Sequence, residues 1–299
     1  MAFNWKTFQT RTLTAIVFAA VMLTGLLWNY WSFFVLFSII HFGCWWEYLK
    51  LTEKIYKTNI NNVIKGLFIF SGYILMVILS LSNATFNIWI SIWGIEVNLK
   101  WLLWASTVFL LLVFIFQNKE IPKNAKWMCL AGLAYISLCW GLMMHLALFQ
   151  VEKFYVKDVF VRIETTTFSS LIPCAIIFSI WINDTMAYIV GSLIGKTPLS
   201  SISPKKTWEG SIGGIILAIA VAGIIAWQFG FDIKMMLMIA AISAIAGTFG
   251  DLLESKLKRM AGVKDSGSLM PGHGGFLDRF DSLLLAIPAV WLYVYFILK

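Results

Sequence analysis

The sequence predicts an all-α, polytopic integral membrane protein of about nine transmembrane helices, with a cytoplasmic N-terminus. Hydrophobic residues make up 60% of the 299 residues and charged residues only 13%, and the mean hydropathy is +0.82. A soluble domain has about 45–50% apolar and about 25% charged residues. A water-soluble globule is therefore excluded, whereas a protein in lipid is apolar outside as well as inside.

A membrane-spanning helix needs about 20 mostly apolar residues. Such windows fall at 12–28, 31–48, 64–82, 101–117, 126–149, 168–194, 211–229, 233–250 and 281–298. The stretch 84–95 is apolar but short, so we expect it at the membrane interface. The first window could be a signal peptide, but the bulky residues from Trp28 to Trp31 replace a small-residue cleavage site, so we expect a first span there.

The lysines and arginines predict the orientation, because cytoplasmic loops are enriched in both. With nine spans and a cytoplasmic N-terminus, 17 of these residues fall on the inner side and 6 on the outer side. The charged segments 195–210 and 251–281 then share the cytoplasmic face. The net charge of +8 reflects this loop bias, so we expect no nucleic-acid partner.

Two regions are expected along the chain. Residues 1–150 form N-terminal transmembrane helices of generic apolar sequence. Residues 151–299 form a C-terminal transmembrane catalytic region, since polar and glycine-containing motifs concentrate after residue 180. The four cysteines lie in apolar stretches without CxxC spacing, and we expect inert core thiols: Cys44, Cys129, Cys139 and Cys174.

The densest set of polar residues lies between the last two predicted spans. Asp251, Ser255 and Lys258 are spaced i, i+4 and i+7, so they share one face of a helix. Asp278 and Asp281 are spaced i, i+3 at the start of the last helix, and they also face together. A glycine-rich run, which can form a tight turn close to a ligand, separates Asp251 from the pair Asp278 and Asp281.

Carboxylates among basic residues suit phosphate chemistry on a metal. Hard cations such as Mg²⁺ prefer carboxylate oxygens and keep substrate phosphates as further ligands, and basic side chains hold the remaining phosphates. The alternative is a solvated charged loop without function. Against it, Asp251 and Asp281 lie at the membrane edge, where unpaired carboxylates are costly.

A second motif at 202–211 has the pattern of a helix start, with Ser203 as N-cap and Pro204 as the first helical residue. Lys205 and Lys206 would then lie in the first turn. Cations are disfavoured there unless an anion binds, which makes this a candidate phosphate site. The alternative is ordinary positive flanking of a span.

Asp184 lies within an apolar span, where an acidic residue indicates function by default. The alternative is a structural ion pair with Lys205 or Lys206. His273 could contact a phosphate, but a lone histidine does not make a metal site. Ser255 and His273 could suggest a hydrolase triad, but no nucleophile-elbow pattern surrounds Ser255.

Other polar residues in the first half are expected to have structural roles. We expect His41 and His145 to form hydrogen bonds between helices. Trp45, Trp46 and Glu47 are expected to anchor their helix at the membrane interface.

The run from Ser255 to Asp281 resembles the signature of the phosphatidate cytidylyltransferases, also called CDP-diacylglycerol synthases. It has the pattern S-x-x-K-R-x-x-x-x-K-D-x-G followed by P-x-H-G-G-x-x-D-R-x-D, without departure at a fixed position. The segments 184–188 and 203–210 are similar to upstream motifs of that family. The resemblance covers 181–282, and the first 150 residues match only in being hydrophobic.

The resemblance implies a nucleotidyltransferase of phospholipid biosynthesis that converts CTP and phosphatidic acid to CDP-diacylglycerol and pyrophosphate, with Mg²⁺ as cofactor. It implies that Asp251 and Asp278 hold metal. The other expected catalytic residues are Asp184, Ser255, Lys258 and Asp281, and the expected substrate-binding residues are Lys205, Lys206, Arg259, Lys264, His273 and Arg279. We expect the protein in the inner (plasma) membrane with its site facing the cytoplasm; a homodimer is left open.

Two other functions remain to be separated by experiment. A CTP-dependent lipid kinase of related fold would move the γ-phosphate onto a polyprenol or similar alcohol and release CDP. A transporter would use Asp184 as a coupling acid and would not consume CTP, but it leaves the acid–base cluster at 251–281 unexplained.

Overall fold

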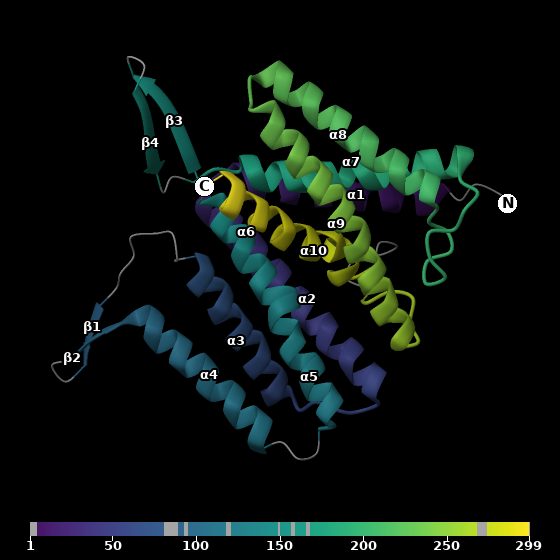
Figure 1. Cartoon of the computed structure of the whole chain (residues 1–299). Helices are drawn as coiled ribbons and strands as arrows, with labels where there is room; N and C mark the ends of the chain where they lie inside the picture. Colours follow the sequence, from purple (N-terminus) through teal and green to yellow (C-terminus); the bar gives the residue numbers. More distant parts are fainter. Residues whose placement is uncertain are drawn as a thin grey trace.

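The structure is a computed structural model that describes residues 5–80, 89–92, 95–117, 121–148, 150–156, 159–165, 168–267 and 274–298. Helices dominate these segments (Figure 1). The α-helices are α1 (Trp5–Leu27), α2 (Tyr30–Tyr56), α3 (Asn62–Ser80), α4 (Leu99–Gln117), α5 (Lys123–Gly132), α6 (Cys139–Ala147), α7 (Leu171–Ile194), α8 (Trp208–Phe229), α9 (Ile233–Met260) and α10 (Leu277–Tyr293). Each of the nine predicted windows falls on a helix.

Seven helical segments of the described chain are long and apolar enough to cross a membrane. They are Tyr30–Tyr56, Asn62–Ser80, Lys123–Ala147, Leu171–Ile194, Trp208–Phe229, Ile233–Met260 and Leu277–Leu298, and a shorter apolar helix covers Thr12–Leu27. The protein is therefore a helical, multi-pass membrane protein. The fifth span continues from α5 to α6 through a π-helical stretch, Leu133–Leu138, and α10 continues into a second one, Val294–Leu298.

Two pairs of antiparallel strands interrupt the helical pattern, and the sequence analysis did not predict them. β1 (Trp89–Ile92) pairs with β2 (Ile95–Asn98), and β3 (Gln150–Val156) pairs with β4 (Val159–Thr165). These segments are rich in β-branched and aromatic residues, which favour extended backbone. The predicted interfacial stretch 84–95 lies partly outside the described residues, and its described part belongs to the first strand pair.

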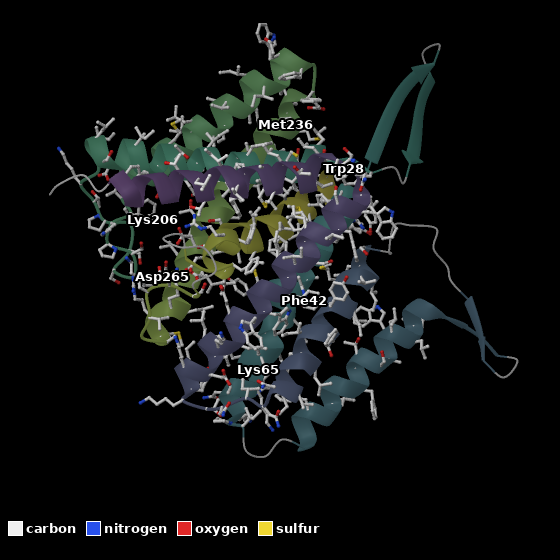
Figure 2. The ribbon with its side chains drawn as sticks, turned by 180° about the vertical axis from the view of Figure 1, so that it is seen from behind. Trp28, Phe42, Lys65, Lys206, Met236 and Asp265 are labelled. Carbon is white, nitrogen blue, oxygen red and sulfur yellow. The ribbon has the colours of Figure 1, made fainter. Side chains whose placement is uncertain are left out.

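The C-terminal helices form the densest packing, where α7 lies against α8 and α9 lies against both α8 and α10. Figure 1 shows the start of α1, the α7–α8 connection and the adjoining ends of α9 and α10 on the same side of the molecule. In Figure 2, seen from behind, Lys206 and Asp265 lie on this side, whereas Trp28 and Met236 lie on the opposite side. Both charged loops therefore meet at one end of the bundle.

The N-terminal helices have a buried polar centre at the π-helical stretch. The Ser137 hydroxyl lies 3.0 Å from His41 Nε2, and it accepts a hydrogen bond of 2.8 Å from Trp45 Nε1. Farther along, Trp291 Nε1 donates to His145 Nδ1 over 3.1 Å. The expected helix–helix hydrogen bonds of both histidines are confirmed. Trp45 is fully buried, so its expected role as an interfacial anchor is wrong; the neighbouring Trp46 is exposed.

The four cysteines are free thiols, as expected, and three of them are buried. Cys139 joins the two halves of the chain, because its Sγ lies 2.8 Å from the carbonyl oxygen of Leu284 in α10. Packing between α6 and α10 therefore crosses the predicted boundary between residues 150 and 151.

Candidate functional site

The last turns of α9 carry the central side chains of the site. α9 runs ten residues past the predicted end of its span, to Met260, without a break. Asp251, Ser255 and Lys258 therefore share one helix face, as their spacing predicted, and Ser255 Oγ donates to Asp251 Oδ1 over 3.2 Å. The sequence analysis did not assign Glu254, whose side chain on the same helix is fully buried.

Lys258 links two carboxylates. Its ammonium group forms an ion pair with Glu254 one turn earlier and donates to Asp278 Oδ1 of α10 over 2.7 Å. The lysine side chain is itself only 12% exposed. A buried charge is tolerated when it is paired and hydrogen-bonded, so this lysine holds α9 and α10 together through charge.

Asp278 also organises the loop that precedes α10. Its Oδ2 accepts hydrogen bonds from the backbone N–H of Ser266 at 2.9 Å, from the Ser266 hydroxyl at 2.9 Å and from the N–H of Gly275 at 2.8 Å. With Lys258, four donors engage this carboxylate. Ser266 is buried and was not singled out in the sequence, where serine in a loop gives no distinguishing signal.

The loop between α7 and α8 brings Lys206 to Asp251, with which it forms an ion pair. The predicted helix start at Ser203 and Pro204 is wrong, because α8 begins at Trp208 with Thr207 as its N-cap. The backbone of the preceding residues forms a turn instead of a helix. Pro198 and Thr207 form an isolated antiparallel β-bridge, and Leu199 N–H donates to the Lys206 carbonyl over 2.7 Å. Both lysines therefore precede the helix rather than lie in its first turn.

Glu209 holds this loop in place. Its carboxylate accepts hydrogen bonds of 3.2 Å from the backbone N–H groups of Lys196 and Thr197. The loop thus folds back on the first turn of α8, and Thr207 Oγ1 accepts from the N–H of Gly210 over 3.1 Å. These contacts explain how a loop of turns holds two lysines at the end of α9.

Two cavities meet at Asp184 and Asp251, which line both of them. The larger cavity has a volume of about 450 Å³ and lies between α7, the lysine-bearing loop and α9. Its polar lining residues are Asn183, Asp184, Tyr188, Ser192, Lys205, Lys206, Thr207, Ser211, Thr248 and Asp251. The intramembrane position of Asp184 thus becomes part of the site, and Lys206 pairs with Asp251.

The smaller cavity, of about 160 Å³, is lined by four aspartates and Arg279 together with apolar side chains of α1 and α7. The aspartates are Asp184, Asp251, Asp278 and Asp281. Their oxygens are the donor type that a hard divalent cation prefers, and Mg²⁺ commonly takes one or two carboxylates plus substrate phosphates. Within the described part of the chain, no group of three or more His, Cys, Asp or Glu side chains is placed so that it could hold a metal ion.

Two of the remaining predicted site residues, Arg259 and Lys264, lie on the exposed surface. Arg259 is exposed, and its Nη1 lies 3.4 Å from the Val263 carbonyl oxygen. Lys264 is also exposed and lines neither cavity. His273 lies outside the residues that the structure describes. Substrate binding by these three residues remains a prediction.

A residue of the N-terminal half also reaches the site. The carboxylate of Glu47 in α2 is buried and accepts hydrogen bonds from Ser266, Phe276 and Leu277. Its expected role as an interfacial anchor is wrong. The sequence signal that could have found it is an acidic residue inside an apolar window, the same signal that singled out Asp184.

These features define an integral membrane protein with carboxylates and lysines gathered at one end of its helices, an arrangement suited to phosphate chemistry. The model of the Cytidylyltransferase family matches residues 9–297, and the chain belongs to this family. The phosphatidate cytidylyltransferase of Staphylococcus haemolyticus is 32% identical over 283 residues, which are 94% of this chain and 96% of that protein.

Other relatives are more identical to this chain over shorter stretches. The phosphatidate cytidylyltransferase of Bacillus subtilis is 46% identical over 122 residues, covering 40% of this chain and 44% of that protein. The chloroplastic phosphatidate cytidylyltransferase 4 of Arabidopsis thaliana is 48% identical over 103 residues, covering 34% and 26%. Family membership thus agrees with the resemblance inferred from the motifs.

Replacing Lys258 by methionine should lower stability by about 3–5 kcal/mol, because it leaves the buried Glu254 charge without a partner. Adding Glu254→Gln to this variant should recover a large part of the loss, because the uncompensated charge is then removed. Thermal unfolding of the purified variants in detergent measures both effects. A double variant no more stable than Lys258→Met alone would contradict the pairing.

Proposed function

We propose that this chain is a phosphatidate cytidylyltransferase, which transfers CMP from CTP to phosphatidic acid and yields CDP-diacylglycerol and pyrophosphate. The observation that carries the proposal is the pair of cavities that share Asp184 and Asp251, flanked by lysines at one end of an apolar helix bundle. Membership in the Cytidylyltransferase family and relatives that bear this activity in their names support it.

The two cavities suit the two substrates. The larger one has Lys205 and Lys206 on its wall, so we assign it to the triphosphate of CTP. The smaller one combines carboxylates and Arg279 with the apolar side chains of Phe18, Ile177 and Trp181. We assign it to the phosphatidate headgroup, whose acyl chains would remain in the bilayer through a lateral opening between helices.

In the proposed reaction, a phosphate oxygen of phosphatidate forms a new bond to the α-phosphorus of CTP. The bond from the α-phosphorus to the bridging oxygen of the β-phosphate breaks, and pyrophosphate leaves in line with the attack. The nucleophile is already anionic, so no general base is needed. Lys206 and Lys258 stabilise the charge that develops on the phosphate oxygens.

We propose Mg²⁺ as the cofactor, held by Asp251 and Asp278 as the resemblance implies, with Asp184 and Asp281 beside them in the smaller cavity. A bound Mg²⁺ would neutralise negative charge on the substrate phosphates. Because four donors engage Asp278 in this structure, the ammonium group of Lys258 would have to share that carboxylate with the ion.

We also propose nine spans in the plasma membrane, with the N-terminus and the site in the cytoplasm, where CTP is available. The nine helical windows and the lysine and arginine bias support this arrangement. The common side of the α7–α8 and α9–α10 connections in Figure 1 is consistent with it.

Incubation of the purified protein with phosphatidate and CTP labelled in the α-phosphate should move the label onto lipid as CDP-diacylglycerol, with Mg²⁺ present and not with EDTA. A lipid kinase would instead release labelled CDP, and a transporter would leave CTP intact. Turnover that persists in EDTA would remove the metal from the proposal while keeping the transfer.

We expect kcat to fall by at least about a hundredfold in each of three variants, Asp251→Asn, Asp278→Asn and Asp281→Asn. Each variant removes one negative charge from the carboxylates around the substrates. The same assay measures the loss, with insertion checked by membrane extraction. Asp232→Asn is the matched control: Asp232 caps the other end of α9 by accepting the Met235 N–H over 3.0 Å, which asparagine can also accept. Full activity in any of the three site variants would exclude that residue from the reaction.

Cysteine labelling tests the orientation, because position 201 belongs to the α7–α8 loop and position 228 to the opposite end of α8. With Ser201→Cys, a membrane-impermeant maleimide should react only after the cells are opened. With Gln228→Cys it should react in intact cells. The reverse pattern would place the site outside the cytoplasm.

A further inference from the structure

Glu47 lies in α2, far from the motifs in sequence, yet the residue is only 6% exposed and both of its carboxylate oxygens accept hydrogen bonds. Oε1 accepts the backbone N–H of Phe276 at 3.0 Å. Oε2 accepts the N–H of Leu277 at 2.9 Å and the hydroxyl of Ser266 at 2.7 Å. A carboxylate of the N-terminal half thus binds both ends of the loop that connects α9 and α10.

The contact supplies a cap that α10 lacks in its own sequence. The first N–H groups of a helix have no partner within the helix, and a nearby negative charge complements the helix dipole. The N-cap residue of α10 is Phe276, whose side chain cannot cap. Glu47 therefore performs this role from another helix, and it fixes where α10 begins.

Glu47 is one hydrogen bond away from the acidic cluster. The Ser266 hydroxyl that lies 2.7 Å from Glu47 also lies 2.9 Å from Asp278 Oδ2, and Asp278 in turn holds Lys258. The hydroxyl has one proton to donate, so these two carboxylates share it. A shift of Glu47 would displace Ser266 and Asp278 together.

The two loop glycines beside Glu47 indicate how closely the loop approaches this carboxylate. A Cβ atom added at Gly267 or at Gly275 would collide with the carboxylate oxygens of Glu47. A larger residue at either position would push the Glu47 carboxylate out of its place, although this side chain belongs to a helix more than two hundred residues away in sequence. Both described ends of the loop therefore lie directly against this carboxylate.

We propose that Glu47 is a positioning residue for nucleotidyl transfer, which sets the start of α10 and thereby the place of Asp278 and Lys258. The inference rests on the proposed function. It assigns a role in the reaction to the N-terminal helices, which would otherwise serve as membrane anchors.

Glu47→Gln keeps the size of the side chain and replaces one acceptor oxygen by an NH₂ group that faces donors. We expect kcat to fall on the order of tenfold to a hundredfold, which is the usual effect of losing a residue that holds catalytic groups in position. The KM for CTP should change little, because Glu47 does not line the cavity assigned to the nucleotide. The assay is CDP-diacylglycerol formation per folded molecule, with the folded fraction taken from size-exclusion chromatography.

Glu53→Gln is the matched control. Glu53 lies on the same helix, accepts a backbone N–H from Ile60 at 2.7 Å and pairs with Lys65 at 2.8 Å, remote from the site. It should keep the wild-type kcat. An equal loss in both variants would overturn the proposal, because the effect would then belong to α2 as a whole.

Hydrogen–deuterium exchange gives a readout that does not depend on activity. The amides of residues 276 and 277 should exchange faster in Glu47→Gln than in wild type. In Glu53→Gln their exchange rates should equal those of wild type. If the wild-type protein makes no CDP-diacylglycerol, the proposed function fails while this comparison still decides whether Glu47 holds the loop. Unchanged exchange, or wild-type kcat in Glu47→Gln, would overturn the proposal.

Ser266→Ala covers the case in which Glu47→Gln does not fold, because it removes one donor and leaves the carboxylate in place. Its kcat should also fall, with faster exchange at 276 and 277. Where both variants fold, the double variant should lose less than the product of the two single losses, because the residues act through one contact. Wild-type kcat in Ser266→Ala would overturn the link from Glu47 to Asp278.

Discussion

Charges at the end of α9 are withdrawn from water, and each depends on the others for a partner. Lys258 lies between Glu254 and Asp278, and Asp278 in turn accepts hydrogen bonds from Ser266 and Gly275. An unpaired charge at this depth would cost several kcal/mol. This electrostatic requirement ties the last turns of α9 to the start of α10 and to the described ends of the loop between them.

The same requirement shapes the other side of the site. Lys206 reaches Asp251 from a loop that Glu209 holds against α8. Lys206 and Lys258 thus form ion pairs with Asp251, Glu254 and Asp278. Two cavities remain, and Asp184 and Asp251 line both of them. An anionic substrate that enters would compete with the carboxylates for the lysines, so binding and rearrangement of the ion pairs are coupled.

Features that depend on local spacing could be predicted from the sequence. The shared faces of Asp251, Ser255 and Lys258 follow from helical periodicity, and the nine apolar windows all fall on helices. The start of α8 was misplaced because Ser203 and Pro204 match a helix start locally, whereas pairing between Pro198 and Thr207 uses that backbone for a turn.

Tertiary partners could not be predicted in this way. Glu47 carries no spacing signal, since its partners lie in a loop that only folding brings near. Glu254 is spaced i, i+4 from Lys258, but the spacing does not show that Asp278 of another helix shares this lysine. The strand pairs β1–β2 and β3–β4 were not predicted, because they are short segments beside long apolar windows whose pattern indicates membrane helices. The residues that carry the chemistry of the site could therefore be predicted better than the residues that hold them in place.

The position of Glu47 has a consequence for how the protein is made. Its backbone donors in α10 lie 229 and 230 residues later in the chain. During synthesis, α2 must therefore enter the membrane with an acidic group whose partners do not yet exist, a state that is costly in lipid. Arrival of α10 relieves that cost, so the packing of this helix and the completion of the site coincide during biogenesis.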